Sequence, residues 1–259
     1  MKTVDNAAIV VTGAGSGIGA ALARRFAAEG ARVVVNDIDA AAASAVAASC
    51  GAIAAPGDAA SADGVAALVA GAREALGEID IYCANAGIAR TGGPETPDAD
   101  WDASWQVNVM AQVRAARLLL GRWLERGSGH LICTVSAAGL LTMPGTASYA
   151  VTKHAALAFA EWLALTYAHR GLTVQAICPQ GVRTGMLDGT NPAAELVLGD
   201  SVITPEAVAD AVLKGIADGR FLILPHPEVA GMYAGRAADT DRWLRGMNKI
   251  QRRMEEAAR

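Results

Sequence analysis

Short apolar runs alternate with longer helical segments along nearly the whole chain, and this alternation constrains the fold more than any other feature. The runs that read as strands cover 7–11, 32–36, 52–55, 79–85, 130–135, 173–178 and 221–225. Segments with helical spacing of apolar residues separate them: 16–29, a run ending near 49, 61–76, 104–125, one starting near 146, and one that Thr204 caps before Pro205. Strands that alternate with helices predict an α/β fold, a doubly wound parallel sheet of about seven strands with helices on both faces.

Length and composition suit one large domain, over 1–259. Of the 259 residues, 53% are hydrophobic and 19% are charged, so a sizeable core is available. The net charge is −4, and no basic cluster indicates a nucleic-acid groove. No apolar run reaches the roughly 18 residues that span a bilayer, and the N-terminus reads as a first strand, not as a signal peptide. We therefore expect neither nucleic acid nor membrane as a partner.

The cysteines and histidines indicate neither a disulfide framework nor a metal site. No CxxC pair occurs, and three of the four cysteines lie in apolar, strand-like runs: Cys50, Cys83, Cys133 and Cys178. This favours buried, reduced thiols in a cytoplasmic protein. The histidines are scattered without metal-ligand spacing, so we expect structural or surface roles for them: His130, His154, His169 and His226.

A glycine cluster joins the first strand to the first helix. Gly13, Gly17 and Gly19 form a G-x-x-x-G-x-G pattern, which differs from the G-x-G-x-x-G spacing of the usual dinucleotide fingerprint. The physical requirement is shared, because glycines permit a tight turn and a helix N-terminus offers free N–H groups to a pyrophosphate. The pattern favours a phosphate-binding turn.

Asp37 lies just beyond the second strand, where the adenosine ribose of a dinucleotide would lie. A carboxylate there can accept hydrogen bonds from the ribose hydroxyls and would repel a 2′-phosphate. No basic residue lies in the glycine loop or closely follows Asp37, so NAD is favoured over NADP. The competing interpretation, a simple cap on the next helix, fits Asp39 better.

Tyr149 and Lys153 are one helical turn apart in the segment that starts near 146. Residues at this spacing share a face of a helix. From these residues alone, a solvated face and a tyrosine packed on a lysine stem remain alternatives to a functional pair.

With the other motifs, the chain resembles the short-chain dehydrogenases/reductases over about residues 5–224. The motifs that carry the resemblance are TGAGSGIG at 12–19, Asp58, NAG at 85–87, Asn108, Ser136, and Tyr149-x-x-x-Lys153. The resemblance implies a Rossmann fold and an NAD-dependent oxidoreductase that transfers a hydride between the cofactor and an alcohol or ketone.

The resemblance also implies four catalytic roles. Tyr149 would exchange a proton with the substrate oxygen, and Lys153 would lower the pKa of that phenol and bind the nicotinamide ribose. Ser136 would hydrogen-bond the same substrate oxygen. Asn108 would hold a water in a proton relay to Lys153.

Further positions are implied to contact the cofactor. They are Gly13, Ser16, Gly17, Ile18, Gly19, Asp37, Asp58, Ala59, Asn85, Ala86, Gly87, Tyr149, Lys153, Pro179, Gly181, Val182 and Thr184. The chain departs from the family's pattern at Gln180, where a glycine is usual. A glutamine there predicts backbone strain, a different local turn, or a side chain that faces the substrate.

Two segments bear on the substrate. Family members fold the region equivalent to 185–203 over the substrate, and its apolar content suggests a hydrophobic secondary alcohol or ketone. The extension 226–259 places four apolar residues on one helical stripe: Trp243, Met247, Ile250 and Met254. This helix could pack on its own subunit, pack on a neighbouring one, or close over the active site.

The helices that hold Asn108 and Tyr149 also carry Trp105, Trp123, Phe159 and Trp162. In the family these helices pair across a dimer axis, so we expect a homotetramer or homodimer. The alternative function is a catalytically silent dinucleotide-binding regulatory protein, which predicts a damaged Ser–Tyr–Lys set, and here the set is intact. Sugar-nucleotide epimerases and enoyl reductases space these motifs differently.

Overall fold

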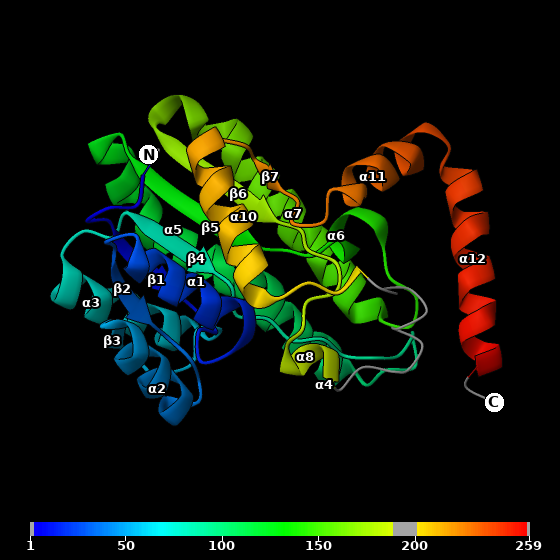
Figure 1. The fold of residues 1–259 in the computed structure, drawn as a ribbon, viewed down its shortest axis with the longest axis horizontal. Helices are drawn as coiled ribbons and strands as arrows, with labels where there is room; N and C mark the ends of the chain where they lie inside the picture. Colours follow the sequence, from blue (N-terminus) through cyan, green and yellow to red (C-terminus); the bar gives the residue numbers. More distant parts are fainter. Residues whose placement is uncertain (1–2, 189–200, 258–259) are drawn as a thin grey trace.

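The computed structural model describes residues 3–188 and 201–257, and within them seven strands form a single sheet (Figure 1). Every neighbouring pair is parallel, and the order is β3-β2-β1-β4-β5-β6-β7. The strands are β1 Ala8–Val11, β2 Arg32–Val35, β3 Ile53–Ala54, β4 Ile81–Ala84, β5 Gly129–Thr134, β6 Leu172–Ile177 and β7 Leu222–Ile223. The order reverses between β1 and β4, which creates a crevice at the carboxyl edge of the sheet, where such folds bind ligands. The predicted doubly wound parallel sheet is confirmed.

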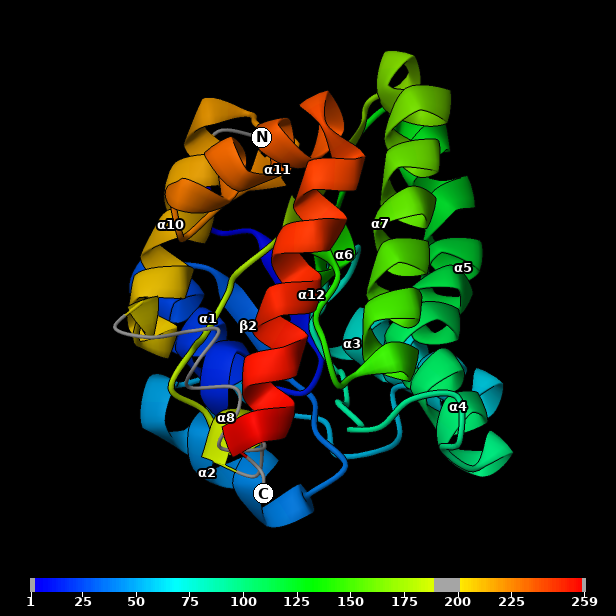
Figure 2. The ribbon, with the colours of Figure 1, turned by 90° about the vertical axis from the view of Figure 1, so that its right-hand side faces the viewer.

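Helices cover both faces of this sheet (Figures 1 and 2). One face packs on α1 Gly17–Ala28, α2 Ala40–Cys50 and α10 Pro205–Asp218. The other packs on α3 Ala62–Leu76, α5 Ala111–Arg126, the short α6 Ala138–Leu141 and α7 Ala147–Tyr167. The remaining helical segments are α4 Asp98–Trp105, the π turn η1 Gln106–Met110, the 3-10 turn η2 Ala168–Arg170, α8 Gly185–Asp188, α11 Glu228–Ala238 and α12 Thr240–Ala257. Successive strand residues alternate between two apolar clusters because side chains of a strand point to opposite faces.

Side-chain caps explain where α2 and α10 begin. Asp39 caps α2, because its Oδ1 accepts hydrogen bonds from the amides of Ala41 and Ala42 at 2.9 and 3.0 Å. Thr204 caps α10 through a 3.3 Å bond from the Ala207 amide, and Pro205 occupies the first helical position. The expected capping residues are therefore confirmed at both helices.

The structure differs from the sequence-based expectation at two elements. The third strand is confined to Ile53–Ala54, both exposed, at the edge of the sheet. The helix expected over 104–125 instead begins at Asp98 and is interrupted by the π turn Gln106–Met110. Periodicity did not predict this turn, because the apolar spacing continues through it. Of the segment 185–203 that was expected to cover the substrate, residues 189–200 lie outside the described residues.

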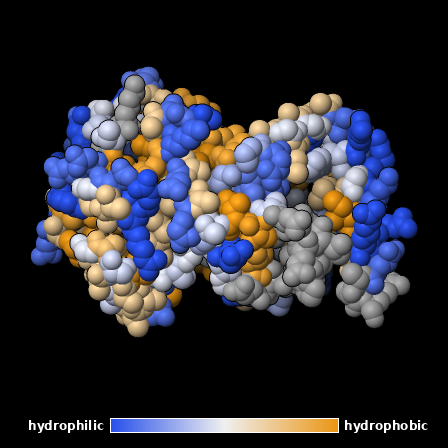
Figure 3. All heavy atoms as spheres, in the orientation of Figure 1, coloured by the Kyte–Doolittle hydropathy of each residue, from blue (hydrophilic) through white to orange (hydrophobic). Residues whose placement is uncertain are grey.

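The C-terminal extension forms α11 and α12, and α12 stands at one end of the molecule next to α11 (Figure 1). Figure 2 shows the same helix in front. The predicted stripe faces inward, since Met254 is buried and Trp243, Met247 and Ile250 are half-buried. The outer edge of the molecule at α12 is hydrophilic (Figure 3). None of the helices in the described ranges is long and apolar enough to cross a membrane.

The buried pair of His130 and Gln175 should make the free energy of unfolding decrease at acidic pH. His130 of β5 is 2% exposed, and its Nε2 lies 3.0 Å from Oε1 of Gln175 on β6. Burial lowers the pKa of His130 to about 4. Because the unfolded chain binds this proton at its ordinary pKa of about 6.5, stability should fall by about 3 kcal/mol as the pH decreases from 6.5 to 4.

Replacing His130 by glutamine, which does not titrate and can still donate to Gln175, should flatten that pH dependence. Urea unfolding between pH 4 and 7 would measure it. His169→Gln, at an exposed position of η2, is the matched control and should keep the wild-type slope. Equal slopes for wild type and His130→Gln would contradict the prediction.

Candidate active site

The glycine turn between β1 and α1 is shaped by close backbone approach. Gly13 and Gly17 have φ values of +60° and +52°, in the left-handed region that favours glycine. A Cβ on Gly19 would lie 2.2 Å from the Gly13 carbonyl oxygen, so only glycine fits there. The N-cap Ser16 makes no side-chain capping bond, which leaves the first amides of α1 free for an anion. A hollow of about 320 Å³ opens at this turn, and its walls include Ser16, Gly17 and Thr184.

Asp37 and Asp58 follow β2 and β3 at the same edge. Asp37 accepts hydrogen bonds from the amides of Gly15 at 2.8 Å and Asp39 at 3.0 Å, so its carboxylate also braces the glycine turn. Asp58 accepts from the amides of Ala60 and Ser61 ahead of α3, and the Ala60 bond holds the pKa of this carboxyl below its usual range. Both acids lie where the sequence placed them, and both have structural partners.

Asn85 is a hub at the switch point between β1 and β4. Its side-chain nitrogen donates to the carbonyl oxygens of Thr12 and Gly13 at 2.9 and 3.1 Å, and its Oδ1 accepts from Thr134 Oγ1 at 3.0 Å. A Cβ on Gly13 would lie 2.8 Å from the Ala86 Cα, so the turn is packed directly on this loop. The side-chain amide of Asn85 therefore connects the ends of β1, β4 and β5.

Two threonines in this network were missed by sequence reasoning. The Thr12 hydroxyl accepts from the amides of Asn85 and Ala86, both at 3.0 Å. The Thr134 carbonyl accepts from the Lys153 ammonium at 2.9 Å. The positions of these threonines could have indicated their role. Thr12 directly follows β1 and Thr134 ends β5, and each lies close to a residue that the sequence analysis singled out.

Ser136, Tyr149 and Lys153 converge beyond the end of β5. Ser136 follows the strand; its Oγ accepts from the Ala138 amide at 3.0 Å and donates to the Pro179 carbonyl at 3.5 Å, and its interaction with Tyr149 lowers the pKa of that phenol. Tyr149 lies in the first turn of α7, and the Lys153 Nζ is 5.6 Å from its ring centroid. A Cβ on Gly87 would lie 3.3 Å from the same ammonium, so the loop after β4 closes on Lys153.

Burial governs the ionisation of this group. The pKa of Tyr149 is raised above its ordinary value because the ring is desolvated, and the Ser136 bond opposes that rise. Burial also lowers the pKa of Lys153 to about 8. Lys153 was expected to lower the pKa of the Tyr149 phenol. In the protein alone that pKa is raised instead, because desolvation of the ring is the larger effect. The Lys153 ammonium, whose own pKa is lowered, already donates to the Thr134 carbonyl.

Asn108 lies in the π turn, and both polar atoms of its side chain have hydrogen-bond partners. Its Nδ2 donates to the Ile88 carbonyl at 2.9 Å and to the Thr152 hydroxyl at 3.0 Å, while its Oδ1 accepts from the Ile88 amide at 2.9 Å. The Asn108 carbonyl accepts a 3.2 Å bond from Gln112. Asn108 thus ties the loop after β4 to α7.

The segment after β6 packs against the glycine turn. A Cβ on Gly17 would lie 2.9 Å from Thr184, and Val182 forms a bridge with Ile203. Gln180 does not have a positive φ, so the strain predicted for it is absent. Its amide donates to His226 Nδ1 at 3.1 Å, and its side chain contacts Met232 of α11 at 3.5 Å. Gln180 therefore joins the C-terminal extension to this segment.

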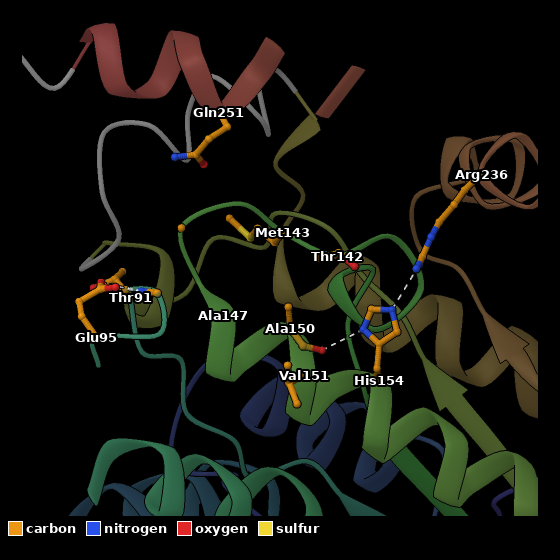
Figure 4. Close-up of a pocket in the computed structure, with 13 residues that line it drawn as sticks. Thr91, Glu95, Thr142, Met143, Ala147, Ala150, Val151, His154, Arg236 and Gln251 are labelled. Carbon is orange, nitrogen blue, oxygen red and sulfur yellow. Dashed lines mark hydrogen bonds between the residues drawn. The ribbon is translucent and has the colours of Figure 1, made fainter. Parts of the chain in front are cut away.

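A hollow of about 930 Å³ lies between the extension and the start of α7 (Figure 4). Its walls come from the loop after β4, the turn that precedes α7, α7 itself, and the extension. Representative members are Glu95, Met143, His154, Arg236 and Gln251. The α7 residues on this wall are Ala147, Ala150, Val151 and His154, which a 100° helical step places on a different face of the helix from Tyr149 and Lys153. The extension therefore walls the outer side of the turn that joins Ser136 to Tyr149.

Known proteins resemble this chain over most of its length. A family model described as short chain dehydrogenase matches residues 7–195. The chain is 38% identical over 230 residues to the 1-deoxy-11-beta-hydroxypentalenate dehydrogenase of Streptomyces exfoliatus, with 85% of this chain and 83% of that protein covered. It is 35% identical over 232 residues to the 2-(S)-hydroxypropyl-CoM dehydrogenase 3 of Xanthobacter autotrophicus, covering 83% and 91%. The crystal structure of a short chain dehydrogenase/reductase from Burkholderia phymatum in complex with NAD matches with a TM-score of 0.83 at 28% identity, covering 93% and 96%.

The buried ammonium of Lys153 should lower the free energy of unfolding at neutral pH. The lowered pKa, about 8 against 10.5, corresponds to about 3 kcal/mol against the charged form, while its bond to Thr134 contributes about 1 kcal/mol. Lys153→Met should therefore stabilise the fold by about 1–2 kcal/mol at pH 7 in urea unfolding. Because the folded pKa lies below the unfolded one, the gain should shrink as the pH rises from 8 to 10.5.

Lys214→Met, at an exposed site of α10, is the control and should change stability little. A Lys153→Met protein that is less stable than wild type at pH 7 would show that the ammonium is a net stabilising group.

Proposed function

This chain belongs to the short-chain dehydrogenase family, and we propose that it is an NAD-dependent oxidoreductase acting on a hydrophobic secondary alcohol or the corresponding ketone. The observation that carries the proposal is the convergence of Ser136, Tyr149 and Lys153 beside the glycine turn at the switch point of the sheet. We place the enzyme in the cytoplasm, in keeping with four cysteines that are all free thiols.

The residues at the carboxyl edge fit a dinucleotide. The free amides of α1 would receive the pyrophosphate, and the two acids after β2 and β3 would face the adenosine end. Asp37 disfavours a 2′-phosphate, and a relative of known structure is a complex with NAD. Thr184, Val182, Gly181 and Pro179 would meet the nicotinamide end. When bound, NAD supplies the hydride acceptor for alcohol oxidation.

Tyr149 would be the general acid/base. In alcohol oxidation the phenolate takes the proton of the substrate hydroxyl, and Ser136 holds that oxygen in place. In ketone reduction the neutral phenol donates the proton. Because burial raises the pKa of Tyr149, oxidation should increase with pH, whereas reduction should be favoured at lower pH.

The substrate class is argued from the hollow beside α7 and from the relatives. Met143, Ala147, Ala150 and Val151 give this hollow apolar walls near the start of α7. The relatives described above are named as dehydrogenases of a hydroxypentalenate and of a hydroxypropyl compound. Both names denote hydroxylated substrates, which supports an alcohol as the reactive group here.

The alternative, a silent dinucleotide-binding regulator, needs a site that binds NAD without proton transfer. The interaction of Ser136 with Tyr149 and the buried ammonium of Lys153 favour the enzyme, because a protein without catalysis gains nothing from burying that charge.

The function is tested by following the absorbance of reduced nicotinamide while purified protein oxidises a panel of bulky secondary alcohols. NAD should support turnover that rises with pH, and NADP should be poorer. Tyr149→Phe should lose at least about 100-fold in kcat, the usual contribution of a general acid/base. Preference for NADP would overturn the role of Asp37. Tight NAD binding without turnover across the panel would favour the silent regulator.

We also propose assembly through an apolar surface on α4, α5 and α7. It comprises Trp105, Leu118, Val151, Trp162 and Leu165, which are 39–75% exposed. Trp123 was expected to belong to the same surface, but it is 2% exposed and donates from Nε1 to the Ile79 carbonyl in the core. Several large apolar side chains exposed on neighbouring helices are typical of a protein interface.

Light scattering at micromolar concentration should therefore give a dimer or tetramer. Leu165→Arg should reduce the mass, because it buries a charge at the proposed interface. Leu244→Arg, an equally conspicuous exposed leucine on α12 at 58% exposure, should leave the mass unchanged. A monomeric wild-type protein would refute this surface as an interface.

A further inference from the structure

Arg236, in the last turn of α11, reaches two segments that carry the reacting groups. Its Nη1 donates to the Leu140 carbonyl of α6 and to Nε2 of His154 on α7, the latter at 3.2 Å (Figure 4). Leu140 belongs to the short helix that follows Ser136, and His154 directly follows Lys153. One guanidinium therefore bridges the Ser136 segment and the Tyr149 helix.

Both acceptors depend on this arginine. Within a helix the Leu140 carbonyl would accept from the amide four residues later, but that residue is Pro144, which has no N–H. At His154, Nδ1 lies 2.9 Å from the Ala150 carbonyl and must donate to it. Arginine has donors only, so Nε2 of His154 must accept, which makes the imidazole neutral with its proton on Nδ1.

The turn between the two segments is strained. Thr142, which ends α6, has φ +65° and ψ 148°, a conformation that is close to exclusive to glycine and is costly for a β-branched residue. Such a conformation persists only where the surroundings enforce it. The enforcing contacts are the Arg236 bond to Leu140 on one side and the Gly92–Gly145 backbone bond of 2.8 Å on the other.

The C-terminal extension holds Arg236 in place. Val229, in the first turn of α11, is fully buried in the main core cluster. His226, just before α11, is buried, with Nδ1 accepting from Gln180 and Nε2 2.8 Å from the Ser201 carbonyl. The near end of α11 is thus fixed to the sheet, and its far end presents the guanidinium to the strained turn.

We propose that Arg236 is a positioning residue, which sets the distance between Ser136 and Tyr149 by clamping the Leu140 carbonyl to His154. The inference rests on the proposed function, and it gives the extension a role in the reaction that is distinct from covering the substrate. Arg236 touches neither Ser136 nor Tyr149, so its effect on the chemistry is transmitted through α6 and α7.

The test compares Arg236→Ala with Arg245→Ala, an exposed arginine of α12. Arg236→Ala should lower kcat by about ten- to a hundred-fold, the scale of an ångström-sized misplacement of a reacting group. The dissociation constant for NAD, titrated by protein fluorescence, should stay within about twofold, because the glycine turn is remote from the clamp. Ethylguanidinium at millimolar concentration should restore part of the lost kcat, whereas Arg245→Ala should match wild type throughout.

Hydrogen exchange read by mass spectrometry supplies a measurement that needs no turnover. Peptides covering 137–147 should exchange faster in Arg236→Ala, and peptides of the glycine turn should not change. Unaltered exchange in 137–147 would overturn the clamp even if wild type proves inactive on every alcohol. Unaltered kcat would overturn the positioning role, and so would a parallel loss of kcat and NAD affinity without ethylguanidinium rescue, which would indicate a general structural role.

Discussion

The side-chain amide of Asn85 is the interaction on which the site depends. It joins the glycine turn after β1 to the loop after β4 and, through Thr134, to the end of β5. A parallel sheet brings these strand ends to one edge, but the strands alone do not fix the distances between them. By hydrogen-bonding to backbone and hydroxyl groups through both polar side-chain atoms, Asn85 fixes the strand ends, and Lys153 then bonds to the Thr134 carbonyl.

Lys153 shows how function opposes stability in this fold. A buried ammonium without a carboxylate partner is unfavourable, and its pKa falls to about 8 in consequence. Burial shifts the pKa of Tyr149 in the opposite direction: it raises it, because desolvation disfavours the phenolate. The two shifts move the pKa values of the pair apart, because burial disfavours the charged form of each group. The core that surrounds them supplies the free energy that offsets this arrangement.

The extension after β7 belongs structurally to the site. Gln180 was expected to introduce strain, yet it adopts an ordinary φ and serves as a contact to His226 and Met232. Arg236 then connects the same extension to α6 and α7. A segment beyond the region of family resemblance thereby restrains the turn that carries Ser136 towards Tyr149, and residues of α12 complete the wall of the adjoining hollow.

The alternation of apolar runs and helices was sufficient to predict the sheet, its parallel strands and the edge that carries the motifs, because these follow from periodicity and chain direction. The caps at Asp39 and Thr204 and the existence of the apolar stripe on α12 were also local enough to predict, whereas the tertiary structure decided that this stripe faces inward. Tertiary structure alone decided that the Asn108 side chain binds Ile88, that Trp123 is in the core, and that burial raises the pKa of Tyr149. Each of these depends on hydrogen-bond partners and desolvation contributed by elements far apart in the chain, and no local pattern contains that information.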